Sequence, residues 1–407
     1  MTDRAIIVGV RRPRMSRTEA LASLEELVEL VRTAGGVVAG RLFQEVKAIH
    51  PATLIGVGKV HDLSEQVRGT NADVVIIDDE LTPVQNRNLE RALEVRVLDR
   101  TALILDVFAL RARTEEGKLQ VEAAQLAYLA PRLVGRGKTF SQQVGRIGTR
   151  GPGETALEYS RRRLRERQVV LNRRLEQVRR ERKVHRAQRE NVPLPLVALV
   201  GYTNAGKSTL MNALTKAGVF VEDTLFATLD PTVRRLRLPS GRMVLLADTV
   251  GFIRRLPHQL VKAFRATFEE IAYAHLIAHI VDVADEDAEH HVATVETVLG
   301  ELELNHKPRL TIHNKSDRQP HHLRRNPEAI PISALTGEGI NHLLERLDEA
   351  LRVGFLRVRL RLPYNRGDIL SEIYRVGHVW KAKHLAKTIS VDCELPEKFV
   401  GKWKRFL

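Results

Sequence analysis

A glycine-rich loop between an apolar run and a helical pattern constrains this chain more than any other feature. Residues 196–208 read LVALVGYTNAGKS, which contains Gly201, four intervening residues, and then Gly206, Lys207 and Ser208. The glycines let backbone N–H groups face phosphate oxygens, and the N-terminus of the following helix adds the positive end of its dipole. Lys207 can reach the outer phosphates, and Ser208 can bind Mg²⁺. The pattern therefore predicts a strand–loop–helix unit that binds a nucleotide.

Two later segments have residue types suited to the metal and the γ-phosphate of that nucleotide. Asp248 opens the segment DTVG at the end of an apolar strand, so its carboxylate can complete a Mg²⁺ shell while the Gly251 amide faces the γ-phosphate. Thr228 matches a switch threonine that closes over Mg²⁺, with a plain turn residue as the alternative. Phe252 stands where Ras-like enzymes use a glutamine to orient water. Phenylalanine has no polar group for that task, so we expect slow intrinsic hydrolysis that another group or a bound partner accelerates.

The segment NKSD supplies base recognition. It follows the strand expected at residues 309–312 and contains Asn314, Lys315 and Asp317. A carboxylate can accept both the ring N–H and the exocyclic amine protons of guanine, while adenine offers no such pair of donors. Residues 333–335 end one more strand and can brace the base through backbone groups. Four motifs in this order, each after an apolar run, indicate a guanine nucleotide-binding domain.

The region before the loop alternates strand-like and helical patterns, which predicts a small open α/β sheet. We expect strands at residues 5–10, 37–39, 74–78 and 95–98, and helices at residues 16–34, 82–94 and 101–111, the first of them capped by Ser16. Gly56, Gly58 and Lys59 lie close together there. They lack the full spacing of a phosphate loop, so a pair of turn glycines is the favoured interpretation and a nucleotide site is the alternative.

A helical hairpin is expected between the sheet and the nucleotide loop. Residues 119–133 have a helical pattern, and a second helix restarts at Thr155, which can form a capping box with Glu158. Apolar residues then recur at seven-residue steps, as in one arm of a two-helix hairpin, at Leu157, Leu164, Leu171 and Val178. Glycines and basic residues crowd the connection between the two helices.

The second arm of this hairpin is strongly basic. Between Glu158 and Glu190 there are 13 Lys or Arg against 5 Glu. A solvated face held by Glu–Arg pairs is one interpretation, but five acids cannot neutralise thirteen bases. The remaining cations can bind RNA phosphates. Because aromatic residues are scarce there, we expect recognition of the RNA backbone and shape rather than base stacking. The candidate RNA contacts are Arg136, Lys138, Arg146, Arg150, Arg161, Arg162, Arg163 and Arg165.

Overall charge and cysteine content narrow the class of protein. The net charge of +15 and the pI near 10.1 favour phosphate-rich partners. A single cysteine, Cys393, allows no internal disulfide and no cysteine-clustered zinc site. No apolar run reaches the roughly 18 residues that a membrane span requires. We therefore expect a cytoplasmic protein without a membrane span, acting as a monomer.

The fragments GYTNAGKSTL, LFATLDPT, DTVGFIRRLPHQLV and NKSD resemble the GTPase domain of the HflX family. Upstream, HPATLIGVGKV, DDELTPVQNRNLE and GTRGPGETALE resemble the N-terminal region of the same family. The resemblance covers nearly the whole chain, with the last 50 residues least distinctive. One departure is Ser160, at a position where family members commonly have Asp.

The resemblance implies an α/β fold with four parts. They are an N-terminal open α/β domain at residues 1–112, a helical hairpin with a Gly/Arg-rich tip at 113–191, a Ras-like P-loop GTPase domain at 192–353, and a small α+β domain at 354–407. In the last part we expect strands at residues 356–362 and 387–394 around a helix at 365–376. The family further implies GTP hydrolysis, binding to the large ribosomal subunit and its rRNA, and dissociation of stalled or stress-inactivated ribosomes.

Asn204 resembles the potassium ligand of some cation-activated GTPases, with a loop-stabilising turn residue as the alternative. The predicted catalytic set is Lys207, Thr228, Gly251 and Asn204, and the predicted Mg²⁺ ligands are Ser208, Thr228 and Asp248. The predicted contacts to GTP or GDP are Gly201, Asn204, Ala205, Gly206, Lys207, Ser208, Thr209, Asp248, Gly251, Asn314, Lys315, Asp317, Ser333, Ala334 and Leu335.

Two other functions stay open from the sequence. One is an RNA-binding assembly or unwinding factor whose N-terminal domain also binds ATP near Gly56, Gly58 and Lys59. The other is a GTP sensor without catalysis.

Arg254 and Arg255, just beyond DTVGF, could act as an internal arginine finger or contact RNA phosphates. The paired histidines lack the spacing of a zinc enzyme, so we expect them on the surface or in packing.

Overall fold

A computed structural model describes residues 3–132, 162–178, 180–181, 194–215, 224–255, 257, 260, 265–318, 327–352 and 355–407. The chain divides into two compact units. The first comprises Met1–Arg179 with the segments Asp223–Asp230 and Arg254–Arg265. The second comprises Arg180–Glu222, Pro231–Ile253 and Ala266–Leu407.

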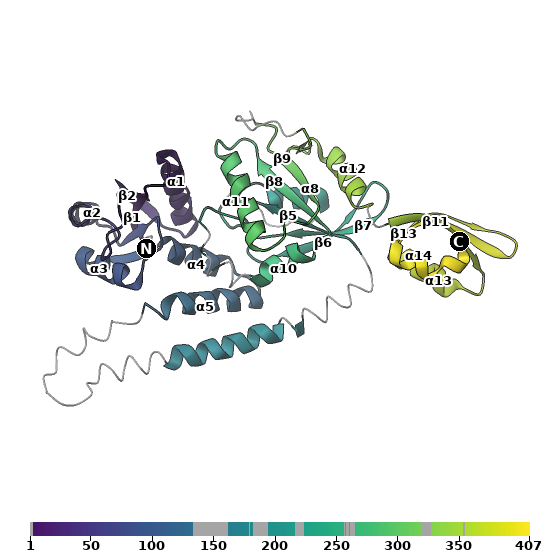
Figure 1. Ribbon diagram of the computed structural model, residues 1–407, viewed down its shortest axis with the longest axis horizontal. Coiled ribbons are helices and arrows are strands. Elements are labelled where there is room, and N and C mark those ends of the chain that lie inside the picture. Colours follow the sequence, from purple (N-terminus) through teal and green to yellow (C-terminus); the bar gives the residue numbers. More distant parts are fainter. Residues whose placement is uncertain are drawn as a thin grey trace. The chain divides into compact units, whose positions relative to one another are not determined.

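The first unit contains a four-stranded parallel sheet with helices packed on it (Figure 1). The strand order is β2-β1-β3-β4, with bounds β1 (Arg4–Arg11), β2 (Val37–Glu45), β3 (Val74–Ile77) and β4 (Arg96–Asp99). The helices are α1 (Arg17–Thr33), α2 (Val57–Thr70), α3 (Pro83–Leu93) and α4 (Arg100–Arg111). Residues 5–10 of β1 are all buried, as expected for a parallel strand covered on both faces. The predicted open α/β fold is confirmed, and Ser16 caps α1 by accepting from the Glu19 N–H at 3.0 Å.

Helix α2 differs from the sequence-based interpretation. Gly56 is its N-cap residue, and Gly58 and Lys59 lie in its first turn rather than in a turn between elements. The Lys59 ammonium lies 3.0 Å from the Asp62 carboxylate on the same helix. Because Gly56 offers no side-chain oxygen as a cap and glycine weakens a helix, the local pattern did not indicate this helix.

Two antiparallel helices follow this sheet in the first unit. Helix α5 (Glu115–Leu129) is capped by Thr114, and residues 162–178 form a second helix. The Arg167 guanidinium contacts the Glu122 carboxylate at 2.6 and 2.9 Å, so the two helices lie side by side (Figure 1). Leu171 of the predicted apolar stripe is fully buried. Arg162, Arg163 and Arg165 are exposed, and Leu164 and Val178 are half-buried. The remaining predicted positions of the arm and its tip lie outside the described residues: Arg136, Lys138, Arg146, Arg150, Thr155, Leu157, Glu158, Ser160 and Arg161.

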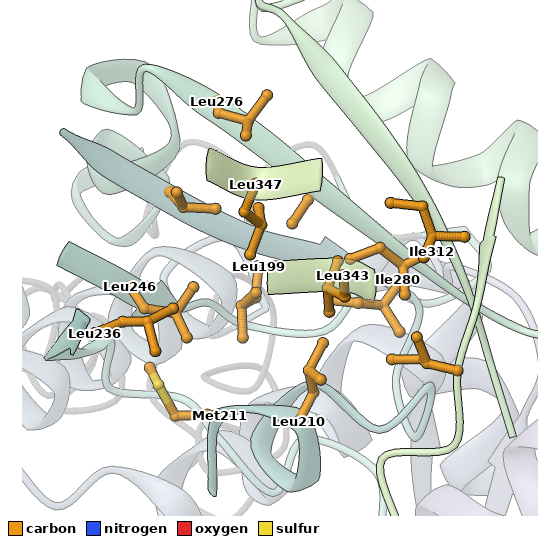
Figure 2. Packing of buried hydrophobic residues seen from close by; sticks show 14 of the residues in the cluster. Leu199, Leu210, Met211, Leu236, Leu246, Leu276, Ile280, Ile312, Leu343 and Leu347 are labelled. Carbon is orange, nitrogen blue, oxygen red and sulfur yellow. The ribbon is translucent and has the colours of Figure 1, made fainter. Parts of the chain in front are cut away.

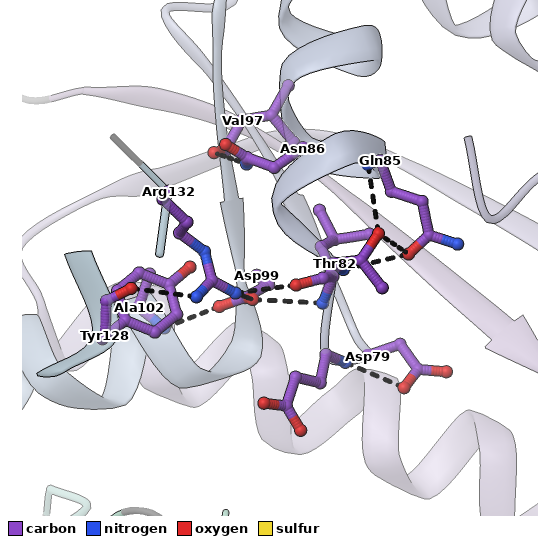
Figure 3. Close-up of polar contacts among 11 residues, drawn as sticks. Asp79, Thr82, Gln85, Asn86, Val97, Asp99, Ala102, Tyr128 and Arg132 are labelled. Carbon is purple, nitrogen blue, oxygen red and sulfur yellow. Dashed lines mark hydrogen bonds and ion pairs between the residues drawn. The ribbon is translucent and has the colours of Figure 1, made fainter. Parts of the chain in front are cut away.

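A buried carboxylate connects β4, α4 and the end of α5. Asp99 Oδ1 accepts from the Ala102 N–H at 2.8 Å and so caps α4. Its Oδ2 accepts from the Leu81 N–H at 3.1 Å and from the Arg132 guanidinium at 3.0 Å (Figure 3). That guanidinium also lies 3.5 Å from the centre of the Tyr128 ring. Burial, together with the charge of Asp99, raises the pKa of the Tyr128 phenol above its ordinary value.

The second unit contains a six-stranded sheet in the order β10-β9-β8-β5-β7-β6, in which only the β6–β7 pair is antiparallel. The strands are β5 (Leu196–Gly201), β6 (Thr232–Arg237), β7 (Met243–Asp248), β8 (Leu276–Asp282), β9 (Arg309–Asn314) and β10 (Ile330–Pro331). The helices are α8 (Lys207–Thr215), α10 (Arg265–Tyr273), α11 (Ala288–Glu301) and α12 (Ile340–Ala350). Side chains from β5, β7, β8 and β9 pack with those from α8 and α12 in one core (Figure 2).

Residues 355–407 form a smaller α+β module with its own sheet, here called the C-terminal module. Its antiparallel sheet has the order β11-β13-β12, with β11 (Phe355–Pro363), β12 (His378–His384) and β13 (Thr388–Pro396). Helices α13 (Gly367–Val376) and α14 (Glu397–Lys402) and the short helix η1 (Lys404–Phe406) complete it. The predicted α+β character is confirmed, and β12 is an additional strand. Among the described residues, no helix combines the length and apolar character that a membrane crossing requires.

Candidate nucleotide site

The carboxyl ends of four neighbouring strands bring the predicted motifs to one edge of the six-stranded sheet. Parallel pairing places Leu199 of β5 opposite Asp248 of β7. It also places Asp282 of β8 opposite Asn314 of β9. In open α/β sheets ligands bind at this edge, because the loops that follow the strands leave a crevice there. The register therefore gathers segments separated by more than a hundred positions in the sequence.

The loop between β5 and α8 has the backbone shape of a phosphate cradle. Asn204 and Gly206 adopt positive φ values of 61° and 92°. A Cβ at Gly206 would lie 2.2 Å from the Asn314 Nδ2 atom, so this position accepts only glycine without rearrangement. The turn directs the chain into α8, whose N-terminal N–H groups are free of partners within the helix and available to an anion.

Asn314 joins the phosphate loop to the base-recognition segments. Its Nδ2 donates to the Ala205 carbonyl at 2.8 Å, and its Oδ1 accepts from the Ala334 N–H at 2.9 Å. The side chain is 1% exposed. The structure thus brings together three of the four predicted motifs through a single amide group.

The carboxylate predicted to read guanine is exposed and ionised. A hydrogen bond from the Ser333 hydroxyl is the main reason that the pKa of Asp317 is lower than usual. Lys315 precedes it in a left-handed conformation, and the Lys315 ammonium lies 2.6 Å from the Asp282 carboxylate. Leu335 is 77% exposed, whereas Ser333 is fully buried. Asp282 was missed by the sequence analysis, although its place at the end of an apolar run was a usable signal.

Lys207 is buried beneath the loop. Its ammonium donates to the Gly201 and Tyr202 carbonyls at 3.2 and 2.7 Å. Burial lowers the pKa of this lysine to about 8, while the charge of Asp248 opposes the shift. The lysine therefore contacts backbone oxygens, and its pKa lies well below the ordinary value of an ammonium group.

This pKa predicts how nucleotide affinity depends on pH. Phosphate charges stabilise the ammonium form, so the nucleotide-bound protein has a higher Lys207 pKa than the free protein. Above about pH 8, where Lys207 of the free protein loses its proton, binding must take up a proton, and affinity should fall by up to about tenfold per pH unit. Below that pH the affinity should be flat. Titration with a fluorescent GDP analogue between about pH 7 and about pH 9 measures this; an unchanged dissociation constant would contradict the assignment.

Ser208 and Asp248 are already in contact. The Ser208 hydroxyl donates to Asp248 Oδ2 at 2.7 Å, and Asp248 is fully buried. A hydroxyl beside a carboxylate is a pair of oxygen donors of the kind that suits Mg²⁺. The donor set therefore fits the predicted metal.

The DTVGF segment lies against the phosphate loop. Phe252 donates its N–H to the Gly201 carbonyl at 3.2 Å, and its carbonyl accepts from the Thr203 N–H at 2.7 Å. A Cβ at Gly251 would lie 2.8 Å from the Thr203 Cα and 3.0 Å from the Lys207 Nζ. The Phe252 ring is fully buried and stacks on Phe268 with 5.6 Å between ring centres, so it is a packing residue.

The predicted switch threonine, Thr228, belongs to the first unit. Thr228 is half-buried in the segment Asp223–Asp230, whereas Ser208 and Asp248 belong to the second unit. In the first unit, Phe226 packs edge-on against Phe108 with 4.6 Å between ring centres. Asp230 accepts from the Thr114 N–H at 2.8 Å at the start of α5.

Arg254 and Arg255 also have partners within the first unit. The Arg254 guanidinium is buried 3.9 Å from the Glu26 carboxylate, and the Arg254 carbonyl accepts from Arg100 at 3.1 Å. The Arg255 guanidinium donates to the Asp78 carbonyl at 3.1 Å. Both side chains therefore make structural contacts within this unit.

The described members of the paired histidines lie at the surface or in packing, as expected, and His275 is exposed. His279 of β8 is 2% exposed, and burial lowers its pKa to about 4, so it is neutral. The His291 ring stacks on Tyr202 with 3.7 Å between centres, which supports the loop from α11 and was not foreseen. Among the described residues, no three His, Cys, Asp or Glu side chains form a cluster able to hold a metal ion. His321 and His322 lie outside the described residues.

Family models match most of the chain. A GTP-binding GTPase N-terminal model matches residues 21–109, and a GTP-binding GTPase middle-region model matches residues 111–189. A model described as a 50S ribosome-binding GTPase matches residues 196–315.

Curated relatives match over the full length. The GTPase HflX of Caldanaerobacter subterraneus subsp. tengcongensis is 46% identical over 405 residues, covering 100% of this chain and 94% of that protein. The GTPase HflX of Escherichia coli K12 is 44% identical over 411 residues, covering 99% and 95% of the two chains. Among solved structures, a GTP-binding protein of Sulfolobus solfataricus in complex with GDP is 25% identical with a TM-score of 0.44, covering 86% and 98%. The full-length relatives and the three models together show that this chain belongs to the HflX family and is a GTP hydrolase.

Proposed function

We propose that this GTPase binds the large ribosomal subunit and its rRNA while GTP is bound, and that it acts in the cytoplasm to dissociate or rescue stalled ribosomes under stress. The family model over residues 196–315 is described as a 50S ribosome-binding GTPase, which is the observation that carries the proposal. The net charge of +15 supports a polyanionic partner. The helix at 162–178 adds six arginines against two glutamates, with Arg162, Arg163 and Arg165 among its exposed residues.

In this proposal the loop residues and Lys207 bind the phosphates, and the Asp317 carboxylate reads guanine. Ser208 and Asp248, already 2.7 Å apart, would hold Mg²⁺, with Thr228 joining them when GTP is bound. The ion would neutralise charge on the β- and γ-phosphates. The Gly251 amide would donate to the γ-phosphate, so that both switch segments respond to hydrolysis. We also propose that the chain has the four domains inferred from the sequence.

Co-sedimentation with isolated ribosomal subunits tests the function. The protein should pellet with the large subunit when a non-hydrolysable GTP analogue is bound, and far less with GDP. An assembly or unwinding factor with its own ATP site near Gly56 to Lys59, at the start of helix α2, is the competing function. ATP binding by the nucleotide-free protein would favour that competitor.

Asn204 gives a separate prediction about monovalent cations. Its φ of 61° fits the turn role, since asparagine tolerates this conformation better than most residues. If its side chain also binds K⁺ near the phosphates, turnover in potassium should exceed turnover in sodium by at least about tenfold. Asn204→Gly keeps the turn but removes the amide, so it should erase the difference between the two buffers. Equal rates for the unmodified protein would remove Asn204 from the catalytic set.

A further inference from the structure

The sheet of the C-terminal module has one covered face and one open face. Val358, Leu360 and Leu362 of β11 and Val391 and Cys393 of β13 pack with α13, α14 and η1 in a single core. Because side chains alternate along a strand, the residues between them point away from these helices. We call this outward side the open face; its exposed residues are Arg357, Arg359, Arg361, Trp380, Lys381 and Lys383.

Strand register arranges the basic residues of the open face in rows. Arg361 of β11 pairs with Ser390 of β13, which pairs with Lys383 of β12, so this row contains no acid. The neighbouring row is Arg359, Asp392 and Lys381. Asp392 lies 3.1 Å from the Arg359 guanidinium and is therefore paired with that cation. Within the described part of the chain, Arg361, Lys381 and Lys383 have no ion-pair partner.

The third row ends the open face with an aromatic platform. Glu394, opposite Arg357 and His378, pairs with the buried guanidinium of Arg242 on the β6–β7 turn. Arg357 instead lies over the Trp380 ring, 5.5 Å from its centre. Trp380 sits in a register shift between Val379 and Lys381 and is 45% exposed. The His378 ring meets it edge-on at 4.6 Å.

Lysines on an edge strand such as β12 often serve only to prevent sheets from associating. That explanation does not account for Arg361 on the opposite edge or for an indole left exposed beneath an arginine. Cations that follow a track beside an exposed aromatic ring fit single-stranded RNA, whose phosphates pair with the cations and whose bases stack on the ring. An acidic peptide would satisfy the cations but would not use the flat ring.

We propose that the open face of the C-terminal module binds single-stranded RNA, with Trp380 stacking on a base and Arg361, Lys381 and Lys383 neutralising phosphates. The site is separate from the basic hairpin arm identified from the sequence. It rests on the proposed ribosomal function only for the source of the RNA, and it can be tested with free RNA.

Tryptophan fluorescence of the full chain provides a local readout. The protein has two tryptophans, and Trp403 is 2% exposed against 45% for Trp380, so a base stacked on the open face should quench mainly Trp380. The nucleotide-free protein is titrated with an oligouridylate of about 16 nucleotides, within the usual range of single-strand sites. Quenching is expected for the unmodified chain. It should be lost in Trp380→Phe, whose GTP turnover stays unchanged.

Charge reversal tests the phosphate contacts. The double variant R361E/K383E should weaken the quenching titration at least tenfold, and losing two contacts should reduce the logarithmic salt slope by about 1.4. The matched control is K404E/R405E, which also reverses two exposed charges, on η1 at the covered side of the sheet. The control should bind RNA like the unmodified protein.

Absence of quenching in the unmodified chain would overturn the proposal, as would equal titrations for R361E/K383E and the control. Displacement of the RNA by polyglutamate at equal charge would also overturn it, because the face would then accept any polyanion. The two proposals fail separately. Quenching without pelleting on ribosomes would contradict the proposed function alone, and pelleting without quenching would contradict only the open-face site.

Discussion

Replacing Asp317 with asparagine should lower GTP affinity by at least about 100-fold and give the protein affinity for xanthosine triphosphate. The Asp317 carboxylate is exposed, and the Ser333 hydrogen bond holds its pKa below the usual value, so it is ionised and can accept two hydrogen bonds. Guanine offers two donors to such a group, its ring N–H and its amine. An asparagine amide can accept only one of them and turns its own N–H group toward the other. Xanthine has a carbonyl oxygen in place of the amine, so the amide can satisfy both of its groups.

Competition between fluorescent GDP and unlabelled GTP or xanthosine triphosphate measures this exchange. The matched control is Glu338→Gln, which neutralises an exposed carboxylate outside the NKSD and 333–335 segments. The control should bind GTP as the unmodified chain does. Undiminished GTP affinity in Asp317→Asn would show that this carboxylate does not read the base.

Gly251→Ala should reduce GTP turnover by about 100-fold, the typical loss when one backbone donor to a developing charge is removed. An alanine Cβ would lie 2.8 Å from the Thr203 Cα, a backbone atom that cannot swing away. The segment must therefore retreat from the phosphate loop, and its amide loses the γ-phosphate. Because GDP has no γ-phosphate, GDP affinity should change little.

Single-turnover hydrolysis and GDP titration separate these effects. Gly58→Ala in α2 is the matched control, since nothing lies within 4 Å of the added Cβ. Turnover of Gly251→Ala equal to that of the control would exclude the proposed role of the amide.

Much of the nucleotide site could be predicted from the sequence because each motif is local. The residues that contact phosphate or base stand at the end of an apolar strand, and parallel pairing then aligns those ends without further information. The contacts between motifs could not be predicted in the same way. Asn314 reaches Ala205, and Lys315 reaches Asp282, only because β9, β8 and β5 are neighbours in the sheet.

Two elements escaped the sequence pattern for local reasons. Helix α2 begins at Gly56 without a side-chain cap, so neither propensity nor capping indicated it. Strand β12 contains a register shift between Val379 and Lys381, which interrupts the alternation of apolar and polar residues that identifies a strand. The packing of Phe226 against Phe108 is likewise a long-range contact that no local pattern encodes.

Occupancy of the guanine nucleotide pocket should determine whether the protein binds the ribosome. If GTP raises affinity for the large subunit, the subunit must raise affinity for GTP by the same factor. If binding neutralises about six phosphates, raising the salt concentration from low to moderate should weaken it on the order of a thousandfold. The most direct measurement is co-sedimentation of the full chain with isolated large and small subunits, in a non-hydrolysable GTP analogue, in GDP and without nucleotide, at two salt concentrations. Salt-sensitive pelleting with the large subunit in the GTP analogue alone is the predicted result, and equal pelleting with the pocket full or empty would contradict the claim.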